Sequence, residues 1–383
     1  MPGALDGLRV IEVAQNIAGP LCAMNLADHG ADVIKVEPLT GEGARSVPPI
    51  VEGESAAFMI WNRNKRSIAL DLKKPSDFDT LMKLAADADI FLQSFRPGVA
   101  ARLGMSWEQL NGRFPRLIYG SISGYGQTGP DAARGGFDLM AQGMSGLMNI
   151  TGPRDGQPHR LPIPICDIAA GLNLTIGLLA AVEARHRTGR GQHVETSLLE
   201  AGISLQLYEA AHYFTTGTNP PRLGQAHRGV APYQVFPCSD GYVTVGAGLQ
   251  HFFEAFCRFA ELPQLIEDPR FIELHDRVAH NDELVRLLSA ATVQHPVHYW
   301  VNGLDQIGVP CAPVLNHDQL FNHPQVVHRG MVETVSHPKL GPTKTLGVSV
   351  KLSDTPGSIR MPAPMLDQHA GEIRQTLERT RSS

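Results

Sequence analysis

The sequence predicts an α/β fold in which a large domain with a parallel β-sheet, covered by helices, is accompanied by a smaller α+β domain. Two observations carry this prediction. Apolar strand patterns alternate with helical patterns through the first two hundred residues, as is typical of parallel strands joined by helical crossovers. The pattern then changes at the turn-rich stretch 215–224, TTGTNPPRLG, and later returns. At 383 residues, the chain has room for two or three units of about 150 residues each.

The first forty residues contain the clearest strand–helix–strand unit. The strand LRVIEVA (8–14) precedes a stretch with helical spacing at 19–30, and the strand ADVIKVEP (31–38) stops at a proline. The alternation then continues, with strands expected at 67–72, 89–95, 116–123 and 191–198 and helices at 75–88 and 168–186. Because these strands are parallel, the loops that follow them are expected at one edge of the sheet, where such folds bind ligands.

The domain boundaries follow from the change in pattern. Residues 1–214 and 333–383 are predicted to form the large domain, 215–224 a linker and 225–332 the small domain. The small domain is expected to contain the strand GYVTVGAG (241–248) and helices at 250–262, 281–291 and 296–306. Proline-punctuated segments after Glu333 lead back to the large domain, with a last helix at 367–380.

Composition and charge argue against several classes of partner. A net charge of −5 with a pI near 6.3 disfavours nucleic acid and acidic membranes, so any anion is expected to be held locally. The opening MPGALDGLRVIEV lacks a secretory pattern, and a cytoplasmic location is expected. The five cysteines lack the spacing of a disulfide framework or zinc site, and the sixteen histidines form no familiar ligand set. No metal site is therefore predicted.

The turn after the first strand, AQNIAGP (14–20), is a first candidate ligand site. It stands where a dinucleotide-binding fold has its glycines, and Glu37 stands where such a fold has its ribose-binding acid. The motif G-x-G-x-x-G is absent, which argues against NAD and leaves a structural turn as the alternative. The loop SGYGQTGP (123–130) is equally open to two interpretations, a ligand loop or a surface turn.

Two basic segments could hold phosphates. Arg63, Lys65 and Arg66 cluster just before a predicted strand, where charge-assisted hydrogen bonds could neutralise a phosphate. Arg96 and Arg102 lie in the loop SFRPGVAARLG, directly after another strand. Such runs are often solvated faces, so the pattern alone leaves both interpretations open.

Asp167 is the one charged residue in the apolar stretch LPIPICDIAAGLNLTIGLLAAV (161–182). It directly precedes the helix expected from Ile168, so it could be the N-cap of that helix. Alternatively, a carboxylate desolvated by apolar neighbours yet kept ionised by helix N–H groups is a competent nucleophile toward an activated carbonyl. Asp138 could likewise simply complement the dipole of its own helix. A Ser/His/Asp system is not indicated, because no G-x-S-x-G motif occurs.

Eight segments carry a family resemblance through their joint order and spacing, and they cover nearly the whole chain. They are LDGLRVIEVAQNIAGPLCAMNLADHGADVIKVEP, NRNKRSIALDLK, SFRPGVAARLG, LIYGSISGYGQTGP, GGFDLMAQGMSGLMNITG, DIAAGLNLTIGLLAAVEARHRTGRGQHVETSLLE, GVPCAPV and KLSDTPG. Together they resemble the class III coenzyme A transferases (CaiB/BaiF type), a family that includes formyl-CoA transferase, carnitine CoA-transferase and the α-methylacyl-CoA racemases.

The resemblance implies that Asp167 is catalytic. Its carboxylate would attack an acyl-CoA thioester to give an aspartyl–acyl anhydride, the CoA thiolate would then form an aspartyl-CoA thioester, and an acceptor carboxylate would collect the CoA. Acyl-CoA and small carboxylic acids are then substrates, and no permanently bound cofactor, metal or ATP is needed. The resemblance also implies a large Rossmann-like domain and a homodimer of two interlocked ring-shaped subunits.

The resemblance further assigns site residues. It places CoA against Gln15, Ala18, Arg66, Leu72, Lys73, Ser94, Phe95 and Arg102. It places Phe137 and Asp138 beside the substrate, and Gly246 and Gly248 in a loop that shields the intermediate from water. Acceptor contacts are expected from small-domain residues such as Arg222, Arg228 and Gln234.

Two positions depart from the family pattern. Racemases of the family have a histidine, and formyl-CoA transferase a tyrosine, where this chain has Phe137. Because a racemase needs a second acid/base, transferase is favoured over racemase, and a formyl or oxalyl substrate is disfavoured. Ser94 stands where many members have asparagine and is expected to replace one hydrogen bond.

The segment GGFDLMAQGMSGLMNITG resembles that of family members that use succinyl-CoA. Succinyl-CoA is therefore the expected donor, and a small dicarboxylate is the expected acceptor. Two alternatives stay open. One is an acyl-CoA racemase or epimerase of the same family, and the other is a non-catalytic CoA-binding protein in which Asp167 only caps its helix.

Overall fold

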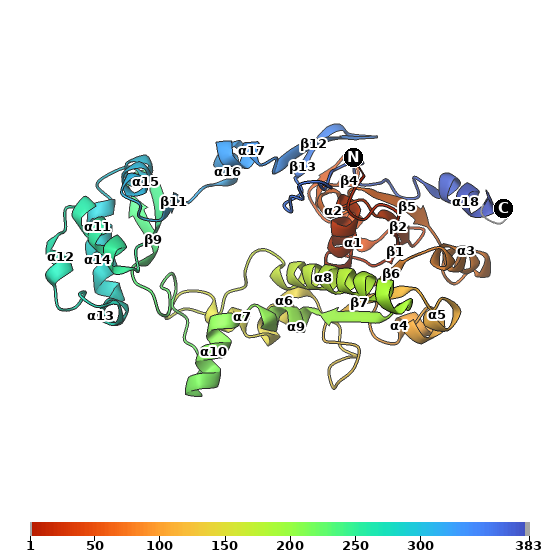
Figure 1. Ribbon diagram of the computed structural model, residues 1–383, viewed down its shortest axis with the longest axis horizontal. Coiled ribbons are helices and arrows are strands. Elements are labelled where there is room, and N and C mark those ends of the chain that lie inside the picture. Colours follow the sequence, from red (N-terminus) through yellow and green to blue (C-terminus); the bar gives the residue numbers. More distant parts are fainter. Residues whose placement is uncertain (1, 380–383) are drawn as a thin grey trace. The chain divides into compact units, whose positions relative to one another are not determined.

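The computed structural model describes residues 2–379, which form two compact units (Figure 1). Unit 1 consists of residues 2–148, 160–217 and 324–379, and unit 2 of residues 149–159 and 218–323. The sequence places 149–159 in the large domain and 324–332 in the small one, whereas contacts group them the other way. Thr380, the last residue of the helix expected at 367–380, lies outside the described residues.

A six-stranded parallel sheet lies at the centre of unit 1, in the order β5-β2-β1-β6-β7-β8, so the predicted α/β class is confirmed (Figure 1). The strands are β1 (Arg9–Val13), β2 (Asp32–Glu37), β5 (Lys65–Ala69), β6 (Ile90–Gln93), β7 (Ile118–Ser123) and β8 (His193–Ser197). From β1 the chain proceeds outward to β2 and β5, and from β6 it proceeds to β7 and β8 on the other side. The strand order therefore reverses between β1 and β6, which opens a crevice at their carboxyl ends.

Unit 1 also contains helices, several of which pack against the sheet. Those before β8 are α1 (Ala18–Asp28), α2 (Ala56–Trp61), α3 (Pro75–Ala86), α4 (Val99–Arg102), α5 (Trp107–Arg113), α6 (Asp138–Met144) and α8 (Ile165–Thr188). Those after it are α9 (Leu198–Ser204), α10 (Leu207–Thr216), α17 (Pro324–His328) and α18 (Ala370–Arg379), while α7 (Leu147–Ile150) passes from unit 1 into unit 2. On one face, Ile11, Phe91 and Tyr119 of the strands pack with Leu81 of α3 and Ile373 of α18.

Short elements complete unit 1. They are the 3-10 helix η1 (Gly43–Ser46) and two antiparallel pairs, β3 (Ile50–Val51) with β4 (Glu54–Ser55) and β12 (Val332–His337) with β13 (Gly341–Leu346). Among the described residues, only α8 is long and apolar enough to cross a membrane by length and composition. It packs along α1, α9, β7 and β8, as a core helix does, while Leu172, Ile176 and Leu179 on its other side are exposed. The predicted absence of membrane contact stays a prediction.

Unit 2 is built on a three-stranded antiparallel sheet in the order β11-β10-β9, with β9 (Tyr233–Cys238), β10 (Gly241–Gly246) and β11 (Cys311–Pro313). Its helices are α11 (Gln250–Phe259), α12 (Gln264–Glu267), α13 (Leu274–Ala279), α14 (Asn281–Thr292), α15 (Val297–Gln306) and α16 (His317–Asn322). The core is aromatic: Phe236, Phe253, Phe256 and Trp300 are buried. The Phe256 ring is in edge-on contact with the rings of Phe236 and Trp300.

Arg277 of α13 is a buried cation that organises unit 2. Its guanidinium donates hydrogen bonds to the carbonyl oxygens of Ala231, Gly248, Phe271 and Ile272 and to Oε1 of Gln250. It also lies 4.5 Å from the centre of the Phe253 ring. A planar guanidinium can serve all these oxygens at once, and an ammonium group cannot.

Replacing Arg277 by lysine is therefore expected to lower the free energy of unfolding of unit 2 by about 3 kcal/mol, since several buried carbonyl groups lose a charged donor. Urea unfolding of the full chain, followed by tryptophan fluorescence, measures this change. Arg258→Lys, at an exposed ion pair with Glu254 on α11, is the matched control and should change it by less than about 0.5 kcal/mol. Equal effects of the two variants would contradict the prediction.

Candidate active site

A cavity of about 190 Å³ opens at the carboxyl ends of β1 and β6, where the strand order reverses. It is lined by Gln15, Asn16, Ala18, Ser94, Phe95, Arg96, Pro97, Ile122, Ser123, Gly124, Arg134, Gly136, Phe137, Asp167 and Leu198. The structure thus brings together six of the predicted site residues, namely Gln15, Ala18, Ser94, Phe95, Phe137 and Asp167. We call this the Asp167 cavity.

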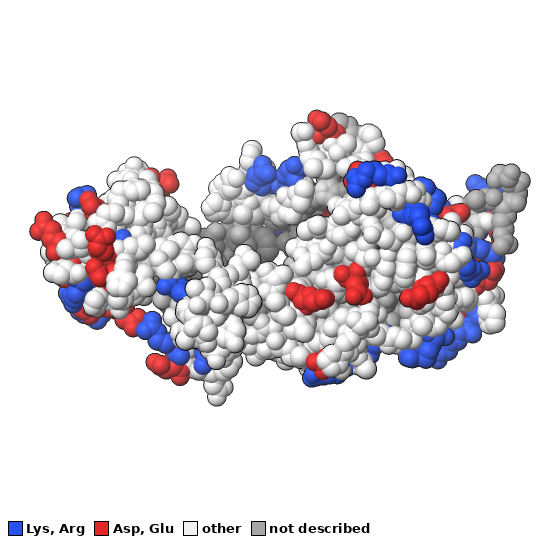
Figure 2. All heavy atoms as spheres, turned by 60° about the horizontal axis from the view of Figure 1, so that its bottom comes forward, with Lys and Arg blue, Asp and Glu red and all other residues white. Residues whose placement is uncertain are grey.

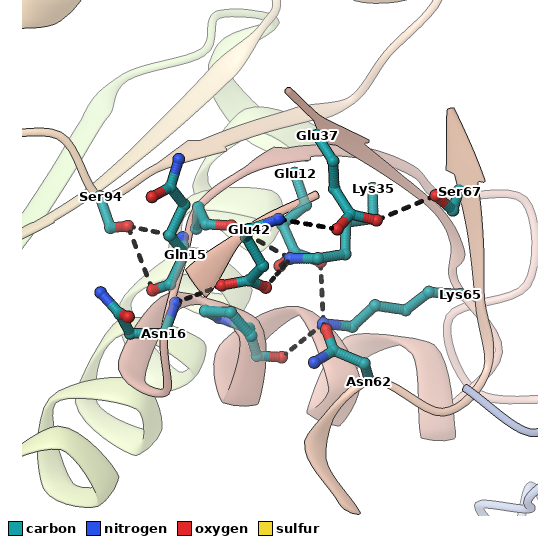
Figure 3. Close-up of polar contacts among 12 residues, drawn as sticks. Glu12, Gln15, Asn16, Lys35, Glu37, Glu42, Asn62, Lys65, Ser67 and Ser94 are labelled. Atoms are coloured by element: carbon teal, nitrogen blue, oxygen red, sulfur yellow. Dashed lines mark hydrogen bonds and ion pairs between the residues drawn. The ribbon is translucent and has the colours of Figure 1, made fainter. Parts of the chain in front are cut away.

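The turn after β1 enters this cavity with a fixed conformation. Asn16 has φ 65°, in the left-handed region that asparagine tolerates better than most residues. Its backbone N–H donates to Oε2 of Glu42 at 2.6 Å, and the N–H of Gln15 donates to Oγ of Ser94 at 2.9 Å (Figure 3). Ser94, expected to replace one hydrogen bond of an asparagine, therefore holds the turn that carries Gln15.

Asp167 lies in the first turn of α8, and the N-cap expected for it is wrong. The helix begins at Ile165 after Pro164, so the backbone of Asp167 is already helical. The capping acceptor is instead Asp138 at the start of α6, whose Oδ1 accepts from the N–H groups of Cys166 at 2.8 Å and Asp167 at 3.4 Å. With the cap supplied by another helix, the Asp167 carboxyl group is left to face the cavity.

The surroundings of Asp167 make its ionisation less favourable than in water. Burial raises the pKa of the Asp167 carboxyl to about 7, and the negative charge of Asp138 adds to the effect. The sequence interpretation of a carboxylate kept fully ionised by helix N–H groups is therefore corrected, because Asp138 takes two of those groups. A carboxyl with this pKa is about half ionised at neutral pH, where it can act as a nucleophile.

Asp138 is held on a second side by Gln142 of the same helix. Its Oδ2 accepts from Nε2 of Gln142 at 2.6 Å, while Oε1 of Gln142 accepts from the N–H of Leu161. These contacts connect α6 to the segment that leads into α8. The predicted substrate contact of Asp138 remains untested, and its observed hydrogen bonds are structural.

The opposite wall of the cavity is formed by loops that approach closely. A Cβ on Gly124 would lie 2.8 Å from the Cα of Gly136, so only glycines allow the segment after β7 to pass the segment before α6. This contact places Phe137 at the rim, where the residue is 61% exposed. Asp167 is the only carboxylate among the described lining residues, and the basic side chains there are Arg96 and Arg134.

A second cavity, of about 340 Å³, follows the carboxyl ends of β1, β2 and β5. It shares Gln15 and Phe95 with the Asp167 cavity and adds the predicted residues Leu72 and Lys73. The two cavities therefore meet at these shared side chains and together form an extended site in unit 1. An extended ligand with an anionic end could lie along them, since the Lys73 side chain is exposed there.

Arg66 and Arg102 line neither of these two cavities. Arg66 forms ion pairs with Asp32 at 2.6 Å and Glu372 at 2.8 Å, near the start of β2, and Arg102 is exposed at the end of α4. Contacts of these two residues with CoA stay predictions.

The basic segment 63–66 does not form one anion site. Arg63 is buried against Asp28, and Lys65 is buried against Glu12, so each cation already has a carboxylate partner. Glu37, considered as a ribose-binding acid, is likewise occupied, because both of its oxygens accept from Arg45 at 2.7 Å. The sequence could not reveal these pairs, since most partners lie on other elements.

The glycines predicted to shield the intermediate lie in unit 2. Gly246 ends β10 and lines a cavity there with Tyr233 and Gln234. Gly248 is packed so tightly that a Cβ would lie 2.1 Å from Cγ1 of Val230, and its carbonyl oxygen accepts from Arg277. Arg222, considered for the acceptor, donates instead to the carbonyl oxygens of Asn149, Pro153 and Gly156.

Sequence reasoning missed Asn16, Glu42 and the capping role of Asp138. The left-handed Asn16 has a weak signal, because asparagine next to a strand end often marks a turn. The roles of Glu42 and Asp138 have no signal in the sequence, because each side chain accepts a hydrogen bond from a backbone N–H more than twenty residues away. Within residues 2–379, no group of three His, Cys, Asp or Glu side chains is placed to hold a metal ion.

Comparison with known proteins shows the family of the chain. The sequence model of the family described as CoA-transferase family III matches residues 5–370. The chain is 38% identical over 371 residues to succinyl-CoA:glutarate CoA-transferase of Mus musculus, covering 96% of this chain and 85% of that protein. It is 35% identical to succinate--glutarate CoA-transferase of Agrobacterium fabrum, covering 98% and 97%. A CAIB/BAIF family protein from Brucella suis has a similar structure, with TM-score 0.90, 35% identity and coverage of 98% and 100%.

Proposed function

Because the chain belongs to CoA-transferase family III, we propose that it moves CoA from succinyl-CoA to a small dicarboxylic acid through covalent intermediates on Asp167. One observation carries the proposal. Asp167, with a pKa raised to about 7, is the only carboxylate among the described residues of a cavity at the reversal point of the sheet. Names of relatives support the substrates, since succinyl-CoA or succinate is paired with glutarate in two of them.

The chemistry requires only the carboxylate and the CoA thiol. An oxygen of Asp167 attacks the thioester carbonyl, the C–S bond breaks, and the thiolate leaves with the bonding electrons. The thiolate attacks the Asp167 carbonyl of the anhydride, which releases succinate and leaves an aspartyl-CoA thioester. The acceptor carboxylate attacks this thioester, and the freed thiolate then takes the acyl group from the second anhydride. The carboxylate of Asp167 is thereby regenerated, and every thioester broken is matched by one formed.

The residues around Asp167 would hold and orient the acyl-CoA. Gln15 and Phe95 lie at the junction of the two cavities, so the pantetheine chain would pass them on its way from Leu72 and Lys73 to Asp167. Holding the thioester beside the carboxylate turns a collision of two molecules into a reaction within one complex. Exclusion of water protects the anhydride from hydrolysis.

Phe137 favours transfer over racemisation. A racemase must remove a proton on one face of the substrate and deliver one on the other. Apart from Asp167, the described lining of the cavity offers no carboxylate or histidine for the second step. The resemblance places Phe137 where racemases of the family have a histidine.

The test is an incubation of the purified protein in D₂O with succinyl-CoA, a 2-methylacyl-CoA and a pool of small carboxylates that includes glutarate. Mass spectrometry of all CoA esters is expected to show new esters, foremost glutaryl-CoA, as succinyl-CoA is lost. Incorporation of one deuterium into the 2-methylacyl-CoA without a new ester would establish the racemase instead. Binding of CoA without any turnover would favour the non-catalytic alternative.

The interlocked homodimer remains a proposal drawn from the resemblance. Support comes from exposed apolar side chains on α8, α9 and α10, including Ile176, Ile203, Leu207 and Phe214. In the view of Figure 2, charged side chains are sparse over much of unit 1, and Lys and Arg gather toward one end of it. Apolar surface of this kind is typical of a face that another chain covers.

A further inference from the structure

A chain of buried charges lies beneath the Gln15–Asn16 turn, between the sheet and α1 (Figure 3). Glu12 of β1 and Lys35 of β2 are opposite each other in the strand pairing, and Nζ of Lys35 contacts Oε1 of Glu12 at 2.9 Å. Lys65 of β5 contacts Oε2 of Glu12 at 2.8 Å, and Lys35 also contacts Oε1 of Glu42 at 2.6 Å. All four side chains are fully or almost fully buried.

Two side chains of this network form hydrogen bonds with the backbone of the Gln15–Asn16 turn and of the residue before it. Nζ of Lys35 donates to the carbonyl oxygen of Ala14 at 3.1 Å, and Oε2 of Glu42 accepts from the N–H of Asn16 at 2.6 Å. Together with the hydrogen bond from Gln15 to Ser94, three consecutive residues of the turn are each held through a backbone group. The holding side chains come from β2, from the end of β6 and from the segment before η1.

The stability of the fold does not by itself explain why these charges are buried. Desolvating two carboxylates and two ammonium groups costs several kcal/mol per ion, and well-packed apolar side chains often stabilise a core as well as such pairs do. Burial lowers the pKa of Lys65 to about 8 even though Glu12 opposes the shift. For Lys35, burial is outweighed by the charges of nearby carboxylates, which raise its pKa, so the charge of each ammonium group depends on its carboxylate partners. What apolar side chains could not supply is an acceptor aimed at the Asn16 amide in its left-handed conformation.

We propose that Glu42 is a positioning residue of the transfer reaction, which holds the Gln15–Asn16 turn against the Asp167 cavity. The inference rests on the proposed function, because Gln15 and Asn16 line the cavity in which Asp167 would react. Glu42 lines neither of the two site cavities and acts through the turn. Lys35 orients the Glu42 carboxylate, and Glu12 contacts both Lys35 and Lys65.

Two substitutions separate the reach of Glu42 from its charge. Glu42→Gln keeps the length, but Lys35 and the N–H of Asn16 donate to different oxygens of Glu42, and the amide replaces one of these acceptors by an NH₂ donor. Glu42→Asp keeps the charge beside Lys35 but is too short to span both partners. Asp28→Asn is the matched control: Asp28 is an equally buried carboxylate, paired with Arg63, that lines neither site cavity.

The measurements are kcat, KM for succinyl-CoA, the Kd for free CoA by calorimetry, and the melting temperature. Both Glu42 variants are expected to lose at least about tenfold in kcat/KM, the loss that a missing charge-assisted hydrogen bond produces. Asp28→Asn should lower the melting temperature but keep kcat/KM within about twofold of wild type, because a merely structural defect reduces the amount of folded protein and not the reaction of each folded molecule.

Three outcomes would overturn the inference: full turnover by Glu42→Gln, full turnover by Glu42→Asp, or an equal loss in Asp28→Asn. If Glu42→Gln fails to fold, Glu42→Asp decides alone. A wild-type protein that binds CoA without transferring it overturns the proposed function only. In that case the Kd for CoA tests the positioning role of Glu42. The Kd is expected to rise about tenfold in the Glu42 variants and to stay unchanged in Asp28→Asn.

Discussion

Asp167→Asn is expected to abolish CoA transfer, with a loss of at least about 10³-fold in kcat, while the protein stays folded. An amide of the same shape fills the same place at the start of α8, but it cannot attack a thioester as a carboxylate does. The pool assay with succinyl-CoA and glutarate measures the loss. Turnover at the wild-type rate would show that Asp167 does not carry the reaction.

Stability provides the control for this variant. The Asp167 carboxyl has a pKa of about 7 in the folded protein, against an ordinary value of about 3.9 in an unfolded chain. Ionisation therefore costs the folded state stability as the pH rises through the window between these values. Asparagine has no such cost, so the variant should melt at the wild-type temperature or higher at pH 8. Lost activity together with a lower melting temperature would instead indicate a damaged fold.

The site could be located from the sequence because the ends of the strands can be predicted from it. The runs LRVIEVA and DIFLQSF predict β1 and β6, and loops that follow parallel strands lie at one edge of the sheet. Asp167 stood out as one charge in a long apolar stretch. The resemblance added Gln15 and Phe95, and the structure brings these two residues and Asp167 to one cavity.

The predictions that were wrong concern contacts between residues far apart in the sequence. The N-cap of α8 could not be read, because Asp138 supplies it from twenty-eight residues before Cys166. The cluster of Arg63, Lys65 and Arg66 looked like one basic patch because its carboxylate partners lie on other elements. Neighbours in a strand point to opposite faces of the sheet, so Lys65 and Arg66 meet different partners, Glu12 and Asp32.

Asp138 is expected to set both the position and the pKa of Asp167. In the wild type, kcat/KM should fall tenfold for each pH unit below about 7, because only the ionised carboxylate attacks. Asp138→Asn keeps an oxygen for the N–H of Cys166 but removes the negative charge. The pKa of Asp167 should then fall, and the acidic limb of the profile should move to lower pH. Profiles of kcat/KM between about pH 5 and pH 9 measure the shift.

Two further variants separate the electrostatic role of Asp138 from its capping role. Asp138→Ala also removes the cap, so it should lower the free energy of unfolding by about 1–2 kcal/mol and reduce kcat about 10²-fold through misplacement of Asp167. Asp87→Asn, at an exposed ion pair with Arg9 near the opposite edge of the sheet, should leave the profile unchanged. An acidic limb that stays near pH 7 in Asp138→Asn would mean that burial alone sets the pKa of Asp167, with Asp138 serving only as the cap of α8.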